Sequence, residues 1–385
     1  MTAPVAAPNR VFPAEPAPAV IASARAIMPI LTSNAAAADR GGKLTVPILA
    51  ALGSSGLLRI GAPRSAGGAD ADRNTVGGVS AVLAEGHASA AWIVGSTAQA
   101  AGEVAADPVL RDIVFGGGEA PMVCDARVPA GEAVPVPGGY RVSGRWHSIP
   151  GAAHAQFALV TVVPHGAGGD AALRTVVPLC ETIRHDAWGA AGMRSAGVMT
   201  IEVDGLFIPE DRFSPAPLPR GYDPTHALVP ASVLVGTAGG ALDHALRTVR
   251  HRPWSGTRFR TAADSAIIQA RLTDAAMHFS GARLHVHRLA TTIDDVLGGF
   301  VELDAVTRIR CRVDAGCAAS AAMATMDALM SAIGAEAVAE SAPFARAWRD
   351  VQTLARHGAV DPLTAREAYG RFLVAEDRTI PGIPL

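Results

Sequence analysis

Residues suited to contact a flat ring follow one another at the end of a predicted strand. The side chains of residues 140–148 alternate in direction as in a strand, which then breaks at Pro150-Gly151. An indole beside an imidazole, a hydroxyl and an irregular backbone offers apolar area together with free N–H groups. Such a stretch could form a wall for a flat ring through Trp146, His147 and Ser148, but on the pattern alone a hairpin with Trp146 in the core is the favoured interpretation.

A second residue suited to chemistry is His357, which follows Asp350 by seven positions. The pKa of histidine lies near neutral pH, so an imidazole in a cavity can act as a general base or proton donor. We predict that His357 lies on a short helix and is catalytic. The alternative is that its positive charge caps the C-terminus of that helix.

A basic cluster, formed by Arg252, Arg258 and Arg260, lies between two predicted helices. Guanidinium groups bind phosphate oxygens through paired hydrogen bonds. We predict that these three arginines hold the phosphate of a cofactor, which can be one bound mainly by a neighbouring subunit. The alternative is a solvated loop.

Two common kinds of cofactor site are not expected. His285 and His287 are two residues apart and point to nearly opposite sides of a helix, and His278 and His285 lie roughly 10 Å apart. This spacing predicts no metal site. No Gly-x-Gly-x-x-Gly follows a predicted strand, which argues against a dinucleotide fold of the Rossmann type.

The composition indicates a well-buried globular protein. Of the 385 residues, 49% are apolar and 18% are charged, and the net charge is −2. This charge balance argues against binding to nucleic acid or to an anionic membrane. No run of about 20 uninterrupted apolar residues occurs, so we predict no membrane span. Four scattered cysteines favour reduced thiols and a cytoplasmic location.

Hydrophobic periodicity divides the chain into three parts. Apolar residues have helical spacing in residues 1–119, alternate in 120–215, and return to long helical stripes in 216–385. We therefore predict an α+β protein with an N-terminal helical domain, a central antiparallel β domain and a C-terminal helical bundle. Residues 1–18 are rich in Pro and Ala and are expected to be loose, and Pro29 is expected to kink the first helix.

Several motifs, in matching order, resemble the acyl-CoA dehydrogenase superfamily. They are Ser89–Trp92, Gly138–Trp146 followed by His154-Ala155, the loop Gly192–Gly197 and the strand end Val203–Pro209. The branch that they resemble most is that of the two-component flavin-dependent monooxygenases. The string from Ser341 to His357 resembles this branch as well, and the order of helical, β and helical parts is similar over the whole chain.

The resemblance implies an acyl-CoA dehydrogenase-like fold with a C-terminal four-helix bundle, assembled as a homotetramer. It implies hydroxylation of a small organic substrate, aromatic or a biosynthetic intermediate, through a flavin C4a-hydroperoxide. Reduced flavin, FMN or FAD, would come from a separate flavin reductase. Trp92 would lie at the substrate, and Trp146, His147 and Ser148 would border the flavin ring. His357 would face that ring as base or donor.

Two features leave other functions open. Many members of the branch carry a serine that stabilises the flavin adduct where this chain has Pro150, so Ser148 or a backbone N–H would have to replace it. A scaffold without that group could serve a flavin-independent, non-redox enzyme or a binding protein. An acyl-CoA dehydrogenase or oxidase needs a carboxylate base, and Glu340 lies one residue from the corresponding position, Ser341.

Overall fold

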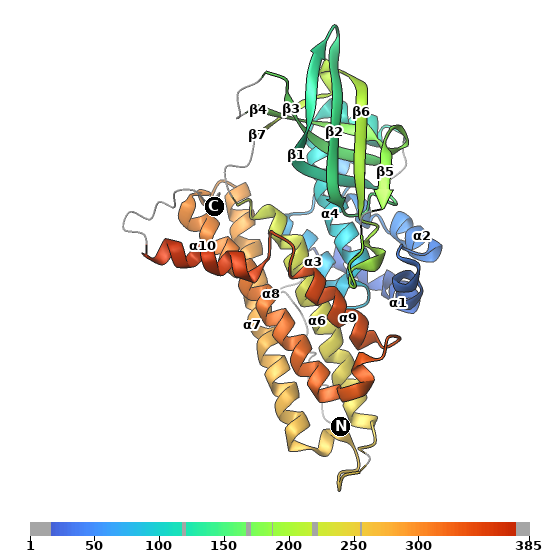
Figure 1. Cartoon of the computed structure of the whole chain (residues 1–385), viewed down its shortest axis with the longest axis vertical. Helices are drawn as coiled ribbons and strands as arrows, with labels where there is room; N and C mark the ends of the chain where they lie inside the picture. The colour runs from blue at the N-terminus through green and yellow to red at the C-terminus, as the bar shows by residue number, and fades with distance from the viewer. Residues whose placement is uncertain are drawn as a thin grey trace.

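The chain folds into helices, a sheet, and helices again (Figure 1). The computed structural model describes residues 17–117, 121–166, 171–186, 188–217, 222–254 and 256–374. The predicted loose segment therefore lies, up to residue 16, outside the described residues. The change from helices to strands falls between α5 and β1, and the change back falls between β7 and α6.

Five helices form the N-terminal part: α1 Pro18–Gly41, α2 Val46–Ser55, α3 Arg73–Ala84, α4 Ala88–Ala106 and α5 Pro108–Phe115. Most residues of α3 and α4 are buried, because α4 packs between α6 and β1, and α3 packs against α1, α4 and α6. The Asp72 carboxylate caps α3 by accepting a hydrogen bond from the Thr75 N–H at 2.7 Å. Pro29, which was expected to kink or interrupt the first helix, lies inside α1 and does not end it.

Seven strands form one sheet in the order β5-β6-β2-β1-β3-β4-β7. Their bounds are β1 Val123–Val136, β2 Gly139–Ile149, β3 Phe157–Pro164, β4 Ala171–Pro178, β5 Ile183–Asp186, β6 Met199–Pro209 and β7 Ser214–Pro217. The prediction of an antiparallel domain is wrong at one pair, because β1 and β3 run parallel. Strand β2 runs back along β1, and the turn after β2 then brings the chain back in the original direction.

The C-terminal part contains α6 Thr225–His251, α7 Ala266–Leu297, α8 Ala305–Ile333, α9 Pro343–Leu354 and α10 Pro362–Val374. Helices α6 to α9 form a bundle that projects away from the sheet, and α10 crosses its upper end (Figure 1). Small residues permit this close packing. Gly239, for example, faces the ring of Phe279, and no room exists there for a side chain.

Short 3-10 helices complete the fold: η1 Leu57–Arg59, η2 Arg64–Ala66, η3 Leu179–Glu181, η4 Arg194–Ala196, η5 Glu210–Arg212, η6 Ala262–Asp264 and η7 Gly334–Val338. The segment η4 lies against both α1 and α4. It thereby ties the end of β2 to the helical part of the molecule.

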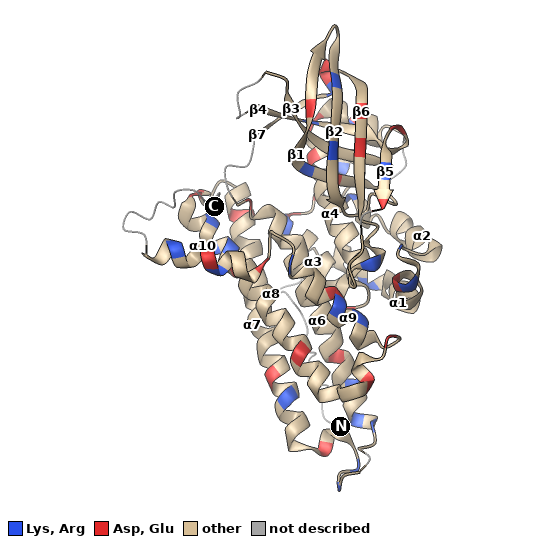
Figure 2. Cartoon of the chain, viewed as in Figure 1, with Lys and Arg blue, Asp and Glu red and all other residues tan. Residues whose placement is uncertain are grey.

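Hydropathy and charge follow from this packing. By length and composition alone, Pro18–Gly41, Thr225–His251 and Ala305–Val338 are long and apolar enough to cross a membrane. In α6, 83% of the most apolar window is buried inside the protein, so core packing accounts for its hydropathy. Figure 2 shows residues of both charge signs interspersed along the helices and strands.

Candidate active site

The end of β2 is bulged, and the bulge exposes two successive side chains. Trp146 pairs with Ile201 and Ile149 pairs with Met199, so β2 has one extra residue between these two pairs. Ser148 has a φ of 57°, a left-handed conformation that is uncommon for a residue with a side chain. Strict alternation would have placed the two side chains on opposite faces. The bulge instead leaves both His147 and Ser148 exposed, away from the core that buries Trp146 and Ile149.

A cavity of about 720 Å³ opens in front of this bulge. The β2 side of the cavity is formed by four consecutive residues, 147–150. Helices α4 and α6, the loop before η4 and the turn after α9 form the other sides. Its apolar lining includes Trp92, Ile149, Pro150, Trp188, Met193, Val229, Pro230 and Leu354.

Three rings meet at one end of the cavity. Trp92 of α4 contacts His357 edge to face, with ring centroids 5.9 Å apart, and lies 6.4 Å from Trp188. Trp92 is 5% exposed, so it is both a core anchor and a cavity wall. The structure therefore brings together Trp92, His147, Ser148 and His357, four of the residues singled out from the sequence.

His357 lies in a turn after α9 and not on a helix as predicted. Its Nδ1 accepts a hydrogen bond from the Ala359 N–H at 3.3 Å, which leaves Nε2 for a ligand. His357 is exposed to solvent and lines the cavity. Desolvation, and then the nearby imidazole of His226, lower its pKa to about 4, so the ring is neutral at pH 7.

Trp146 does not line the cavity. It is 1% exposed, and its Nε1 donates to the carbonyl of Thr161 at 3.1 Å. A side chain at either Gly131 or Gly144 would overlap its ring, so these two glycines make room for the indole. The structure thus shows the hairpin with a core tryptophan, because regular alternation continues through Trp146 and fails only at the bulge.

The loop from residue 188 to 197 is fixed onto α9. The Asp350 carboxylate accepts a hydrogen bond from the Met193 N–H, and Arg349 donates through Nε to the carbonyl of Ala191 at 3.0 Å. Gly192 lies against the carbonyl of Arg349, where no side chain fits. The Arg-Asp pair before His357 therefore positions the wall of the cavity that carries Trp188 and Met193.

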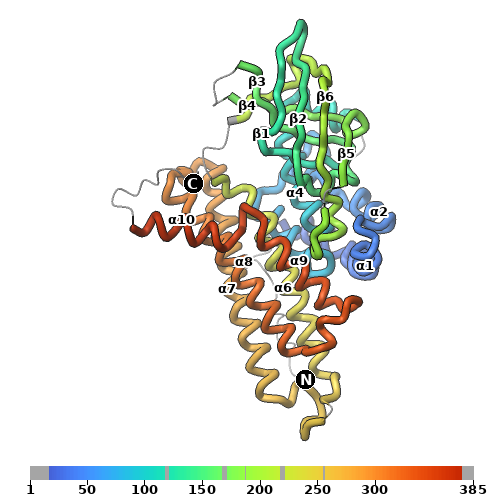
Figure 3. Tube along the Cα trace, viewed as in Figure 1, coloured from blue at the N-terminus to red at the C-terminus, as the bar shows by residue number. Residues whose placement is uncertain are grey.

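The predicted phosphate-binding arginines lie elsewhere. Arg252, Arg258 and Arg260 follow α6 in the loop at the end of the bundle far from the sheet (Figure 3). Arg252 donates to the carbonyl of Ile333 and lies 3.3 Å from a carboxylate oxygen of Glu336. None of the three lines the cavity of its own subunit. A role in phosphate binding therefore stays a prediction that applies to flavin bound by a neighbouring subunit.

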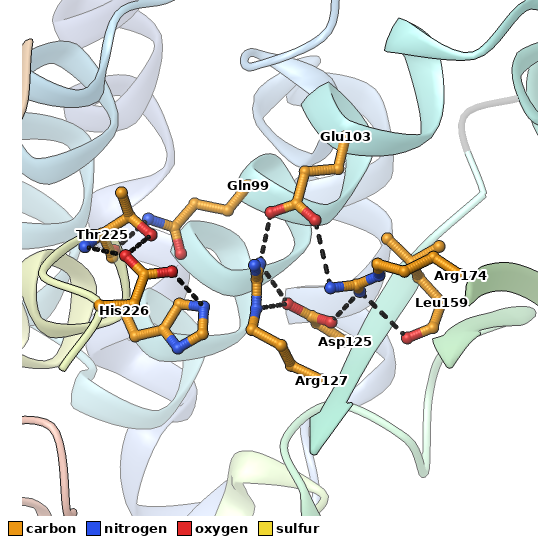
Figure 4. A network of polar contacts seen from close by, with 9 residues as sticks. Gln99, Glu103, Asp125, Arg127, Leu159, Arg174, Thr225 and His226 are labelled. Atoms are coloured by element: carbon orange, nitrogen blue, oxygen red, sulfur yellow. Dashed lines mark hydrogen bonds and ion pairs between the residues drawn. The ribbon is translucent and has the colours of Figure 1, made fainter. Parts of the chain in front are cut away.

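A network of charged side chains forms the other end of the cavity (Figure 4). Arg127 donates to Asp125 through Nε at 3.0 Å and through Nη2 at 2.8 Å, and it also pairs with Glu103. Arg174 pairs with the same two carboxylates. Burial alone would raise the pKa of Asp125, but Arg174 and Arg127 outweigh it and hold that pKa well below its usual range.

A larger cavity, of about 940 Å³, lies on the far side of this network. Arg127 lines both cavities, whereas Trp92, His147, Ser148 and His357 line only the smaller one. Size alone would favour the larger cavity, but the aromatic rings and the bulge select the smaller one as the site. Its volume lies in the range usual for cofactor and substrate pockets.

Known proteins resemble this chain over nearly its whole length. Residues 228–362 match the family described as acyl-CoA dehydrogenase, C-terminal domain. The oxygenase subunit HsaA of a flavin-dependent monooxygenase from Mycobacterium tuberculosis is 26% identical, and the match covers 92% of this chain and 95% of that protein. The oxygenase component of an FADH2-dependent resorcinol hydroxylase from Rhizobium is 25% identical, and the match covers 85% of this chain and 87% of that protein.

A solved structure agrees in fold. XiaF from Streptomyces, in complex with FADH2 and glycerol, is 27% identical and superposes with a TM-score of 0.84, covering 94% of this chain and 97% of that one. The resemblance to acyl-CoA dehydrogenases and to flavin-dependent monooxygenases that the sequence motifs indicated is therefore confirmed. The order of helices, sheet and helices predicted from the sequence is also shared with the XiaF structure.

The cavity fits a flavin ring. Its walls are largely apolar and aromatic, and the bulge leaves two residues outside the regular pairing of β2 with β6, so that their polar groups face the cavity. His147 is held by a 3.3 Å contact between its Nδ1 and the hydroxyl of Thr200. Glu340, the base that a dehydrogenase would need, does not line this cavity.

Gln99 and His226 are cavity residues that the sequence analysis missed. Gln99 lies on α4 seven residues after Trp92, with Ser96 between them, so the three residues follow one helix face. This spacing was visible in the sequence and could have identified Gln99. His226 lies in the first turn of α6, and no pattern in the sequence sets it apart.

Proposed function

We propose that this chain is the oxygenase component of a two-component flavin-dependent monooxygenase that hydroxylates a small aromatic substrate. One observation supports this most: the imidazole of His357 and the strained bulge at Ser148 face one cavity whose lining is mostly apolar by area. A bound flavin and substrate would cover this open cavity and exclude water from the reacting atoms. The names of the similar proteins favour the same activity.

The flavin would be held by His147 and Ser148 at the bulge, against the apolar wall formed by Ile149 and Pro150. When bound in reduced form, flavin supplies the activated oxygen atom for hydroxylation. Pro150 lines the cavity and has no N–H to donate. Ser148, two residues earlier and displaced outward by the bulge, is the hydroxyl available in its place.

His357 would act on the substrate as a hydrogen-bond and proton donor. Its Nδ1 accepts a hydrogen bond from the Ala359 N–H, so the neutral ring carries its proton on Nε2, which can donate to an oxygen atom in the cavity. Trp92 holds the imidazole edge to face and fixes its orientation.

Reduced flavin would come from a separate flavin reductase, as the description of two relatives as oxygenase subunits or components suggests. FMN and FAD both remain open as cofactor. A homotetramer is part of the proposal, since it would bring the cluster of Arg252, Arg258 and Arg260 from one subunit to the flavin of another.

A coupled assay tests the proposal. The chain is mixed with NADH, a flavin reductase, FMN or FAD and a panel of phenols and fused-ring aromatics under isotopically labelled O2. We expect a hydroxylated product that contains one labelled oxygen atom. Hydrogen peroxide alone with every substrate, or unlabelled product, would contradict the proposal.

A further inference from the structure

The part of the cavity that Gln99 and His226 line is polar, and no step of the proposed reaction uses these two residues. Along one face of α4, Trp92 leads through Ser96 to Gln99, which lies about 10 Å further along the helix axis. Gln99 and His226 of α6 both line the cavity at this end. The cavity therefore has an aromatic end at Trp92 and a polar end at Gln99.

The amide of Gln99 is oriented by the backbone of α6. Its Nε2 donates to the carbonyl of Thr225 at 2.9 Å (Figure 4). This bond determines which amide atom is the nitrogen, and it leaves Oε1 without a hydrogen bond among the described residues. Gln99 therefore offers an acceptor to a ligand.

His226 is oriented by a carboxylate in a similar way. Its Nε2 is buried 3.5 Å from Oδ2 of Asp223, whose other oxygen accepts hydrogen bonds from the N–H and the hydroxyl of Thr225. A carboxylate beside Nε2 favours the proton on that nitrogen. Burial, and then the charge of Arg127, lower the pKa of His226, so the ring is neutral and Nδ1 is left as an acceptor.

The charges nearby argue against an anionic ligand. Arg127 and Arg174 are each paired with Asp125 and Glu103, so the two cations are balanced by two carboxylates. The carboxylate of Asp223 lies directly behind His226. A negatively charged group beside His226 would therefore find Arg127 already paired and would approach an additional carboxylate. Arg356, which also lines the cavity and binds Gln352, follows α9 beside His357.

We propose that the end of the cavity formed by Gln99 and His226 binds an uncharged hydrogen-bond donor of the substrate, a hydroxyl or an N–H group. The inference rests on the proposed function and makes it more specific. A substrate held by its donor is thereby oriented within the cavity that His357 also lines. Gln99 and His226 thus select the substrate and determine which ring position reacts.

Binding of naphthol and of its methyl ether to the flavin-free full chain tests this proposal. The two probes differ by one hydrogen-bond donor, and isothermal titration calorimetry measures their dissociation constants without any oxygen chemistry. We expect the unchanged protein to bind naphthol about tenfold more tightly, as one good hydrogen bond provides. Equal binding of the two probes, or binding of neither, would overturn the proposal.

Two variants and a matched control locate the donor site. His226→Phe keeps a ring without an acceptor, and Gln99→Met keeps the length of the side chain; each is expected to reduce the preference for naphthol at least threefold. Ser96→Ala changes a polar residue on the same face of α4 and is expected to keep the full preference. A preference that persists in both His226→Phe and Gln99→Met would overturn the proposal.

The result is independent of the hydroxylation assay. Loss of hydroxylation with an intact preference for naphthol would refute the proposed activity and leave the donor site standing. Hydroxylation of the methyl ether as readily as of naphthol would support the proposed activity and refute the donor site. The comparison of the two probes on the unchanged protein also stands if a variant fails to fold.

Discussion

At the scale of single residues, the site depends on two side chains in unusual environments. His357 is kept neutral by desolvation, and Ser148 is kept in a left-handed backbone conformation by the bulge of β2. Unfavourable conformations of this kind persist where the surrounding structure enforces them, and they gather at functional sites. Substitutions of either residue are therefore expected to change hydroxylation and stability independently of each other.

Replacement of His357 by alanine is expected to reduce hydroxylation about 100-fold to 10,000-fold, the usual contribution of a group that transfers a proton in the reaction. The melting temperature should change little, because the imidazole makes one weak hydrogen bond to the backbone. Product formation and peroxide release, measured together, check this, and His165→Ala on the surface is the control. Unimpaired hydroxylation in His357→Ala would remove His357 from the mechanism.

Replacement of Ser148 by glycine is expected to stabilise the fold by about 0.5–1 kcal/mol, because glycine adopts a positive φ without steric cost. The same change removes the hydroxyl that we assign to flavin and should lower hydroxylation. Denaturant unfolding and the coupled assay measure the two effects. If Ser148→Gly destabilises the protein, the argument for strain at the bulge is wrong.

At the scale of elements, the positions of β2 and α9 depend on close approaches that only glycine allows. Gly131 on β1 gives room to the ring of Trp146, and Gly192 gives room to the carbonyl of Arg349. These contacts hold the bulge on one side of the cavity and the aromatic loop on the other. Changes there should act on stability first and on activity only as a consequence.

Gly131→Ala is expected to destabilise the protein by about 1–3 kcal/mol, because the added methyl group would overlap the indole of Trp146. Gly53→Ala is the matched control, since Gly53 lies in α2 with no atom near the added group, and alanine there favours the helix. Urea denaturation compares the two variants. Equal effects would show that Trp146 is not packed as described.

Asp350→Asn should make the protein relatively more stable as pH rises. Burial raises the pKa of Asp350 to about 7, so between about pH 4 and pH 7 the unfolded chain binds fewer protons at this group than the folded chain. The wild-type protein therefore loses up to roughly 1.4 kcal/mol per pH unit through this group, and asparagine does not titrate. Unfolding free energies at several pH values check this; a constant difference between variant and wild type would contradict it.

At the scale of the whole molecule, the sequence predicted the order of the parts better than the contacts between them. The switch from helical to alternating periodicity is a local property, and it marks the β region correctly. The parallel pairing of β1 with β3 depends on contacts between distant segments, and nothing local in the sequence signals it.

In the site, too, local motifs could be predicted from the sequence, whereas contacts between distant segments could not. His147, Ser148 and His357 belong to motifs in the sequence, and the structure places all three in one cavity. Trp146 was expected there too, because strict alternation gives no sign of the bulge that follows it. Gln99 and His226 become neighbours only through the packing of α4 on α6, so their role needed the folded chain.

The central claim is that a flavin ring binds in the cavity between the bulge of β2 and His357. A crystal structure of the chain grown with excess FMN tests it most directly. The account predicts the ring against His147 and Ser148, with the imidazole of His357 facing the same space. A flavin bound outside this cavity, or the cavity filled by protein side chains in that crystal, would contradict the account.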